Sequence, residues 1–196
     1  MGYPAAGLLF FLFGFTAVFA VVPASASDYS LSAGGGIDFP AGGLWGDTGA
    51  GFKPSPAVKV SVEKTLDKLL SYGLDSSLSM SHENRKLPDL KIKIFSLVPY
   101  LKAFYSRNGR SYYGFTGVGL YQWAQTSFRS AGVSRSSASG TSPGLLLGGG
   151  VSYPFWRGST ASFEARWNHV FNMRGGNFSL DSADNLGFMF VVGSRL

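Results

Sequence analysis

Apolar and polar residues alternate along most of this chain after residue 28. In residues 29–39, one set of alternate positions holds Tyr, Leu, Ala, Gly, Ile and Phe, and the other set holds Ser, Gly and Asp. Residues 58–63 and 72–80 repeat the pattern. Because successive side chains of a β-strand point to opposite faces, each segment predicts a strand with one apolar face and one small or polar face.

Five later segments extend this pattern and bring the predicted total to eight strands. Residues 112–123 place Tyr113, Phe115, Tyr121 and Trp123 at alternate positions, so these rings are expected on the apolar face. The segments are 90–105, 112–123, 145–155, 160–171 and 186–196.

The connections between these strands alternate between long and short. The long ones cover residues 41–55, 82–89, 124–141 and 172–184, and the short ones cover 65–71, 106–110 and 156–159. Long loops at one end and short turns at the other predict an up-and-down antiparallel meander. The third long loop is polar and rich in Ser, and it is expected to be mobile.

The polar face decides between a soluble and a membrane barrel. A soluble barrel shows many charged side chains to water, whereas this face is mostly Gly, Ser and Ala with isolated charges, as suits a narrow lumen. Aromatic residues at both ends of the apolar face match interfacial girdles, and strands of about 9–11 residues can cross a bilayer when tilted. The sequence therefore predicts an all-β, eight-stranded antiparallel up-and-down transmembrane β-barrel.

The composition agrees with a β-protein and narrows the functional classes. Only 14% of the 196 residues are charged, 15% are aromatic and 27 are Gly, which excludes a disordered chain and disfavours a helical one. The absence of Cys means that no disulfide stabilises the fold. The net charge of +6 is spread singly along the chain, without the basic run that nucleic-acid binding needs.

Residues 1–27 differ from the remainder and predict an export signal. An uncharged apolar run at residues 6–22 precedes Pro23 and the small residues Ala24, Ser25 and Ala26. This order indicates a signal peptide cleaved near Ala26, with the barrel covering 28–196. A retained short membrane anchor is the alternative, although 17 apolar residues are few for a spanning helix.

Several segments of the chain resemble the small eight-stranded outer-membrane barrels, namely the OmpA-type transmembrane domain and its OmpX and opacity-protein relatives. They are "AGGGIDFPAG", "VPYLKAFY", "GLLLGGGVSYPF", "ASFEARWNHVF" and "NLGFMFVVGSRL". The resemblance covers nearly all of residues 28–196 and implies a bacterial outer-membrane location. It also implies two partners: outer-membrane lipids, with lipopolysaccharide as a candidate, and the barrel-assembly machinery.

Eight ionisable residues fall on the polar face of the predicted strands. Four acids and four bases in one narrow lumen are expected to pair, since an unpaired buried charge costs several kcal/mol. We therefore expect a lumen plugged by charge pairs. The candidates are Asp38, Lys59, Glu63, Asp75, Lys102, Glu164, Arg166 and Arg195.

A second group of cations precedes and begins the fourth strand. Arg85, Lys86, Lys91 and Lys93 are expected at the outer rim, where they could neutralise the phosphates of lipid head groups. The alternative, which the sequence supports equally well, is that these four cations are ordinary solvated loop residues.

The two histidines bear on whether the chain is an enzyme, because a Ser–His or Asp–His hydrolase site would need one of them. His82 is expected to be a solvated loop residue, and His169 shares its face with Phe163, Trp167 and Phe171, which places it among lipid-facing aromatic residues. No Ser–His hydrolase motif, metal-ligand spacing or cofactor motif is present, so no catalytic residue is assigned. Three functions stay open: a structural, adhesive or surface-recognition barrel, a narrow channel for small solutes, and a lipid-modifying enzyme.

Overall fold

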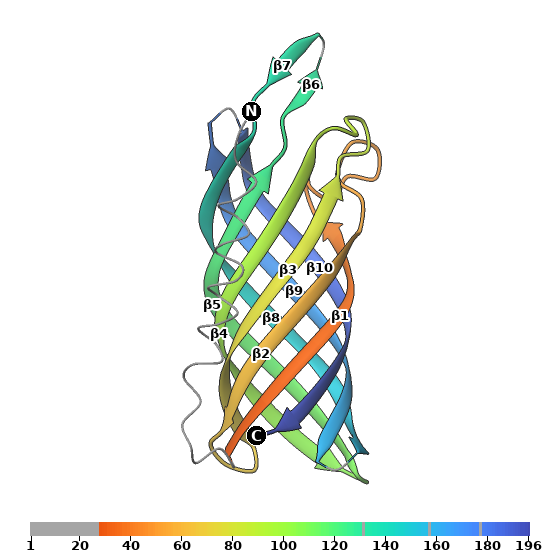
Figure 1. Ribbon diagram of the computed structural model, residues 1–196, viewed down its shortest axis with the longest axis vertical. Coiled ribbons are helices and arrows are strands. Elements are labelled where there is room, and N and C mark those ends of the chain that lie inside the picture. The colour runs from red at the N-terminus through yellow and green to blue at the C-terminus, as the bar shows by residue number, and fades with distance from the viewer. Residues whose placement is uncertain (1–27, 131, 157, 177) are drawn as a thin grey trace.

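The computed structural model describes residues 28–196 except residues 131, 157 and 177, so the predicted signal peptide lies outside the described residues. Eight long antiparallel strands close into a barrel in the order β1-β10-β9-β8-β5-β4-β3-β2, which confirms the up-and-down prediction (Figure 1). Two short strands, β6 and β7, form a separate hairpin. The strands are β1 (Tyr29–Ala41), β2 (Ser55–Thr65), β3 (Leu70–Glu83), β4 (Lys91–Arg107), β5 (Arg110–Gln125), β6 (Phe128–Ser130), β7 (Val133–Arg135), β8 (Ala138–Trp156), β9 (Ser159–Gly175) and β10 (Phe178–Arg195).

The first and last long strands close the barrel. β1 pairs with β10 from Ser30↔Arg195 to Ala41↔Asp184, and it pairs with β2 on its other side. Closure leaves no unpaired strand edge in the wall, which hydrocarbon would penalise strongly. In the described part of the chain, no helix has the length and apolar character needed to cross a membrane.

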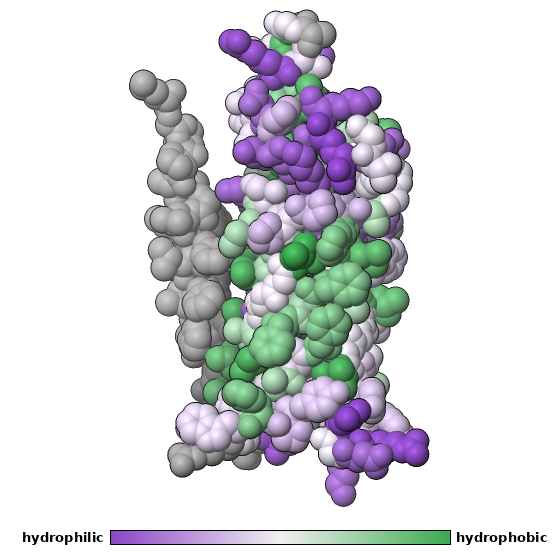
Figure 2. All heavy atoms as spheres, turned by 90° about the vertical axis from the view of Figure 1, so that its right-hand side faces the viewer, coloured by the Kyte–Doolittle hydropathy of each residue, from purple (hydrophilic) through white to green (hydrophobic). Residues whose placement is uncertain are grey.

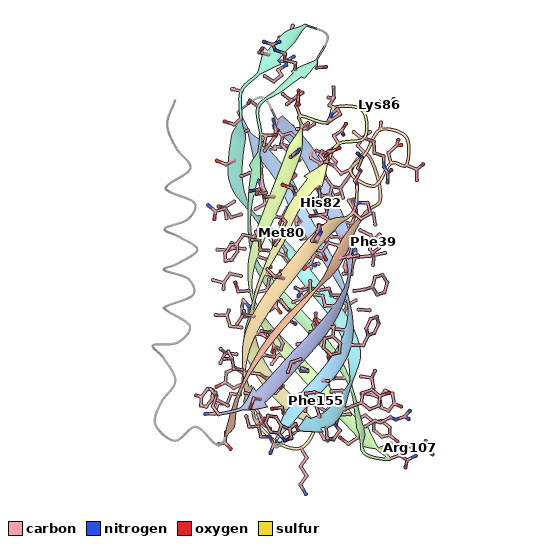
Figure 3. All side chains as sticks on the ribbon, turned by 45° about the vertical axis from the view of Figure 1, so that its right-hand side comes forward. Phe39, Met80, His82, Lys86, Arg107 and Phe155 are labelled. Atoms are coloured by element: carbon pink, nitrogen blue, oxygen red, sulfur yellow. The ribbon has the colours of Figure 1, made fainter. Side chains whose placement is uncertain are left out.

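The outer wall of the barrel is an apolar belt. Large side chains that would normally be buried in a soluble protein are exposed here, including Val118 at 63% and Phe190 at 58%. Figure 2 shows hydrophobic residues in a band between two hydrophilic ends. We call the end with Lys86 the loop end and the end with Arg107 the turn end (Figure 3). Lipid solvates such a belt, so the outward direction of the apolar face is confirmed.

The strands run further toward the loop end than the sequence predicts. The stretch 172–184 is not a long loop, because β9 and β10 continue and turn at Gly176, whose φ is +56°. The third predicted loop contains the β6–β7 hairpin, which projects from the loop end (Figure 1). Both prediction errors have one cause: beyond the lipid both faces of a strand can be polar, so the alternation that reveals a strand is lost.

The aromatic residues of β5 point into the barrel, so their predicted place on the lipid side is wrong. Tyr113, Phe115, Tyr121 and Trp123 are all at most 8% exposed. The positions on β8 that face Tyr113, Phe115 and Trp123 are glycines, and a Cβ at Gly148 would overlap the Phe115 ring. Both faces of β5 are apolar near its centre, and the space left by these glycines determines which face fills the lumen.

Candidate functional site: the closed lumen and the loop end

Four charged side chains from three strands meet inside the barrel. Lys59 Nζ on β2 lies 2.8 Å from Glu164 Oε1 on β9 and 3.0 Å from Asp75 Oδ2 on β3. Arg166 Nη2 on β9 donates to Asp75 Oδ1 over 2.8 Å. Each of these side chains is at most 5% exposed. We call this set the lumen network.

The lumen network is electrically balanced and crosses the barrel. Two carboxylates and two cations offset the cost of removing each charge from water, which in isolation would be several kcal/mol per ion. Asp75 is the shared partner, because it binds both Lys59 and Arg166. The strands β2 and β3 are thereby linked to β9, with which neither pairs in the sheet.

A second ion pair lies toward the turn end. Lys102 Nζ and the Tyr100 hydroxyl both donate to Glu63 Oε2 over 2.9 Å. The Lys102 ammonium also lies 4.2 Å from the centre of the Tyr113 ring. The side chains of Lys102 and Glu63 are 18% and 11% exposed, so this pair is better hydrated than the lumen network.

Two of the eight candidate lumen residues stand apart from these pairs. Asp38 is buried on β1 and accepts a hydrogen bond from the Ser79 hydroxyl, but its Oδ1 has no partner. Arg195 is exposed at the end of β10 and lines a shallow pocket with Phe155 and Trp156. Among the described residues, the lumen thus brings together six of the candidates as ion pairs, with Asp38 beside them and Arg195 outside.

Apolar side chains fill the lumen on the loop side of the network. Trp45 and Phe52, from the connection 42–54, are both buried, and their ring centres lie 4.5 Å apart. The Trp45 indole donates to Asn185 Oδ1 on β10 over 2.9 Å, which fixes this connection over the barrel. The remaining buried members of this plug include Ile92, Ile94, Val98, Tyr121, Trp123, Leu146, Val170 and Met173.

His82 belongs to this plug, so its predicted place in a solvated loop is wrong. Its ring is fully buried 5.1 Å from Trp45, and its Nδ1 lies 3.0 Å from the Lys53 carbonyl oxygen. A register shift in β3 between Ser79 and His82 turns the side chain inward (Figure 3). A β-bulge of this kind inserts one residue and reverses the alternation beyond it.

His169 lies on the outer wall, among the aromatic residues that the sequence assigned to it. Its ring contacts Phe171 at 4.3 Å and Trp167 at 5.4 Å between centres. Its Nδ1 lies 2.7 Å from Asp184 Oδ1 on the neighbouring strand β10. In the described part of the chain no Ser hydroxyl is hydrogen-bonded to either histidine, and no group of three His, Asp or Glu side chains could hold a metal.

The cations near the start of β4 occupy the loop end. Lys91 and Lys93 are exposed on the outward face, and the same face continues into the belt with Phe95 and Leu97. Lys91 Nζ lies 4.0 Å from Glu83, whose other oxygen lies 2.6 Å from Lys53 Nζ.

Arg85 and Lys86 are exposed in the adjacent connection, beside the ordered turn around Asp47. The Asp47 carboxylate accepts hydrogen bonds from the backbone N–H groups of Gly49 and Ala50, over 2.6 Å and 3.0 Å, which hold its pKa below the usual value. This carboxylate therefore orders the connection 42–54 that carries Trp45.

Solved structures with the same architecture come from several bacteria. Neisserial surface protein A superposes with a TM-score of 0.64 at 17% identity, over 87% of this chain and 98% of that one. The chain has the fold of a small outer-membrane β-barrel. OprG from Pseudomonas aeruginosa matches this barrel with a TM-score of 0.57 at 12% identity, over 87% and 96%.

A third match is Ail of Yersinia pestis, solved in complex with the heparin analogue sucrose octasulfate. It superposes on the barrel with a TM-score of 0.51 at 17% identity, over 86% of this chain and 97% of that one. No family model matches the chain, and no curated protein matches its sequence. The fold together with the apolar belt is that of a barrel that crosses a membrane.

Proposed function

We propose that this barrel is a closed scaffold that serves surface recognition or adhesion through its loop end. The observation that carries the proposal is the filled lumen. The lumen network and the plug of apolar side chains occupy the space that a solute would need. The connection 42–54 is bonded into the barrel through Trp45 and Asn185. A rigid frame with ordered, outward connections is the usual arrangement of a binding surface.

The charge of the loop end suggests the class of partner. Eight basic and four acidic side chains lie in residues 42–54, 83–93, 126–137 and 174–181. Such an excess attracts acidic polymers and the phosphates of lipopolysaccharide. Ail shares this fold and holds a sulfated sugar in its structure, which supports an acidic polysaccharide as the extracellular partner of this barrel.

Bilayer recording of the purified protein separates this proposal from a channel. We expect no stable conductance, because ions would have to pass buried side chains that are paired across the lumen. Exchanging the loop-end connections for short turns, with the strands kept, should abolish binding to an acidic polysaccharide while heat-modifiable gel mobility is retained. A large and stable conductance would instead support the narrow channel for small solutes.

The rim lysines are proposed to contact lipid head groups. Replacing Lys91 and Lys93 together by Gln should weaken binding of the purified barrel to lipopolysaccharide about thirtyfold at low salt, since each cation near an anionic surface contributes about 1 kcal/mol. Isothermal titration at two salt concentrations would measure this, and the difference should shrink at high salt. Gln at both Lys64 and Lys68, which lie at the turn end, is the matched control and should leave the affinity unchanged.

A further inference from the structure

A groove of about 420 Å³ opens beside the β6–β7 hairpin at the loop end. Its volume falls in the range of small-molecule sites, roughly 300–1,000 Å³. The groove lies between the hairpin and Phe178 at the start of β10. The lining residues are Gln125, Phe128, Ser130, Val133, Arg135, Ser136 and Phe178.

The apolar side of the groove rests on the plug of the barrel. Phe178 packs on Trp123 with the ring centres 5.2 Å apart, and Trp123 itself is fully buried. Gly140 and Gly175 flank the Trp123 ring so closely that a Cβ at either position would lie within 3 Å of it. The floor is therefore fixed before any ligand arrives, which reduces the entropy cost of binding.

Two polar groups in the groove have unused hydrogen-bonding capacity. Gln125 is 5% exposed, and its Oε1 has no hydrogen-bond partner. An unpartnered buried oxygen is costly, and a ligand hydroxyl would satisfy it once the Gln125 amide turns into the groove. Arg135 is exposed on the groove, and the guanidinium fork matches a carboxylate in a bidentate arrangement.

We propose that this groove binds one uronic acid residue of an acidic polysaccharide outside the cell. The carboxylate lies on Arg135, a ring hydroxyl donates to Gln125, and the apolar face of the sugar ring packs on Phe128 and Phe178. The positive charge of the loop end agrees with an acidic occupant. This site rests on the proposed recognition function and specifies its ligand.

The hairpin supplies a matched pair of variants for the test. Arg135 lines the groove, whereas Arg129, on the adjacent strand of the same hairpin, does not. Both side chains are exposed, and replacing either by Gln removes one positive charge. Binding of hyaluronan tetrasaccharide, which carries uronic acid and no sulfate, is measured on the folded barrel in detergent, with neutral dextran as the control ligand.

We expect Arg135→Gln to weaken hyaluronan binding at least tenfold and Arg129→Gln to weaken it less than twofold. Gln125→Met, which keeps the size but removes the acceptor, should weaken binding about fivefold. Equal effects of the two arginine variants would show that the groove is not the binding site. Binding would then rest on the general positive charge of the loop end, and the proposed function would stand. Binding of lipopolysaccharide without binding of hyaluronan would overturn the assigned ligand. If acidic-polysaccharide binding is lost on loop exchange but is unchanged in the Arg135 and Gln125 variants, the groove is excluded as the site.

Discussion

Replacing Asp75 by Asn is expected to lower the free energy of unfolding by about 3–5 kcal/mol. The change removes the carboxylate that binds both Lys59 and Arg166 inside the barrel. Arg166 is fully buried, and its guanidinium would then lie 4.0 Å from its nearest remaining carboxylate, that of Glu164. Urea titration of the barrel in lipid vesicles, followed by tryptophan fluorescence and heat-modifiable mobility, would measure the loss.

Two further variants show whether charge pairing is the cause. Glu63→Gln breaks the better hydrated pair with Lys102 and should cost only about 1 kcal/mol. Adding Arg166→Met to Asp75→Asn leaves the Lys59 and Glu164 pair intact and should recover part of the stability. Equal losses in the Asp75 and Glu63 variants, or no recovery in the double variant, would contradict a balanced lumen network.

Replacing Gly148 by Ala is expected to destabilise the barrel by about 1–3 kcal/mol. The added methyl group would overlap the Phe115 ring and lie 2.7 Å from the Ala165 carbonyl oxygen. Phe115→Leu in the same chain should restore part of the loss by freeing the space that the ring occupies. Denaturant midpoints of the four proteins in this cycle give the coupling between the two positions.

Gly114 provides the control for that substitution. It lies on β5 at an outward position, and the nearest atom to a Cβ there is the Gly148 carbonyl oxygen at 3.8 Å, an ordinary contact. Gly114→Ala should therefore change the midpoint little. A loss as large as that of Gly148→Ala would show that added side chains disturb these strands generally, without a specific clash with Phe115.

The architecture could be predicted from the sequence because lipid makes the alternation strict. Residues such as Ile37 and Phe39 must face outward in the belt while Asp38 faces inward, and the pleat enforces that order at each position. The same rule put Lys59, Asp75, Glu164 and Arg166 into the lumen. Which of them pair depends on how β2 and β3 face β9 across the barrel, and alternation along a single strand carries no such information.

The filling of the lumen near the loop end could not be predicted from the sequence, for physical reasons. The bulge before His82 reverses the alternation, and nothing in the surrounding residues marks it. Trp45 lies in a connection rich in Gly, and only the contact with Asn185, 140 positions further along the chain, shows that it closes the lumen. The direction of Tyr121 on β5 depends on the room left by Gly144 across the strand pair. Each of these features depends on partners distant in sequence.

The lumen network joins residues from the amino-terminal and carboxyl-terminal halves of the barrel, so it is complete only when the barrel closes. Lys59 and Glu164 are 105 positions apart, and Asp75 and Arg166 are 91 apart. A partly inserted sheet that ends before β9 would carry the charges of Lys59 and Asp75 without their partners from β9. Contacts of such high sequence separation form slowly. Lys59 and Asp75 can pair with each other on β2 and β3 before then, but the second partner of each, Glu164 and Arg166, is present only when β9 is in place.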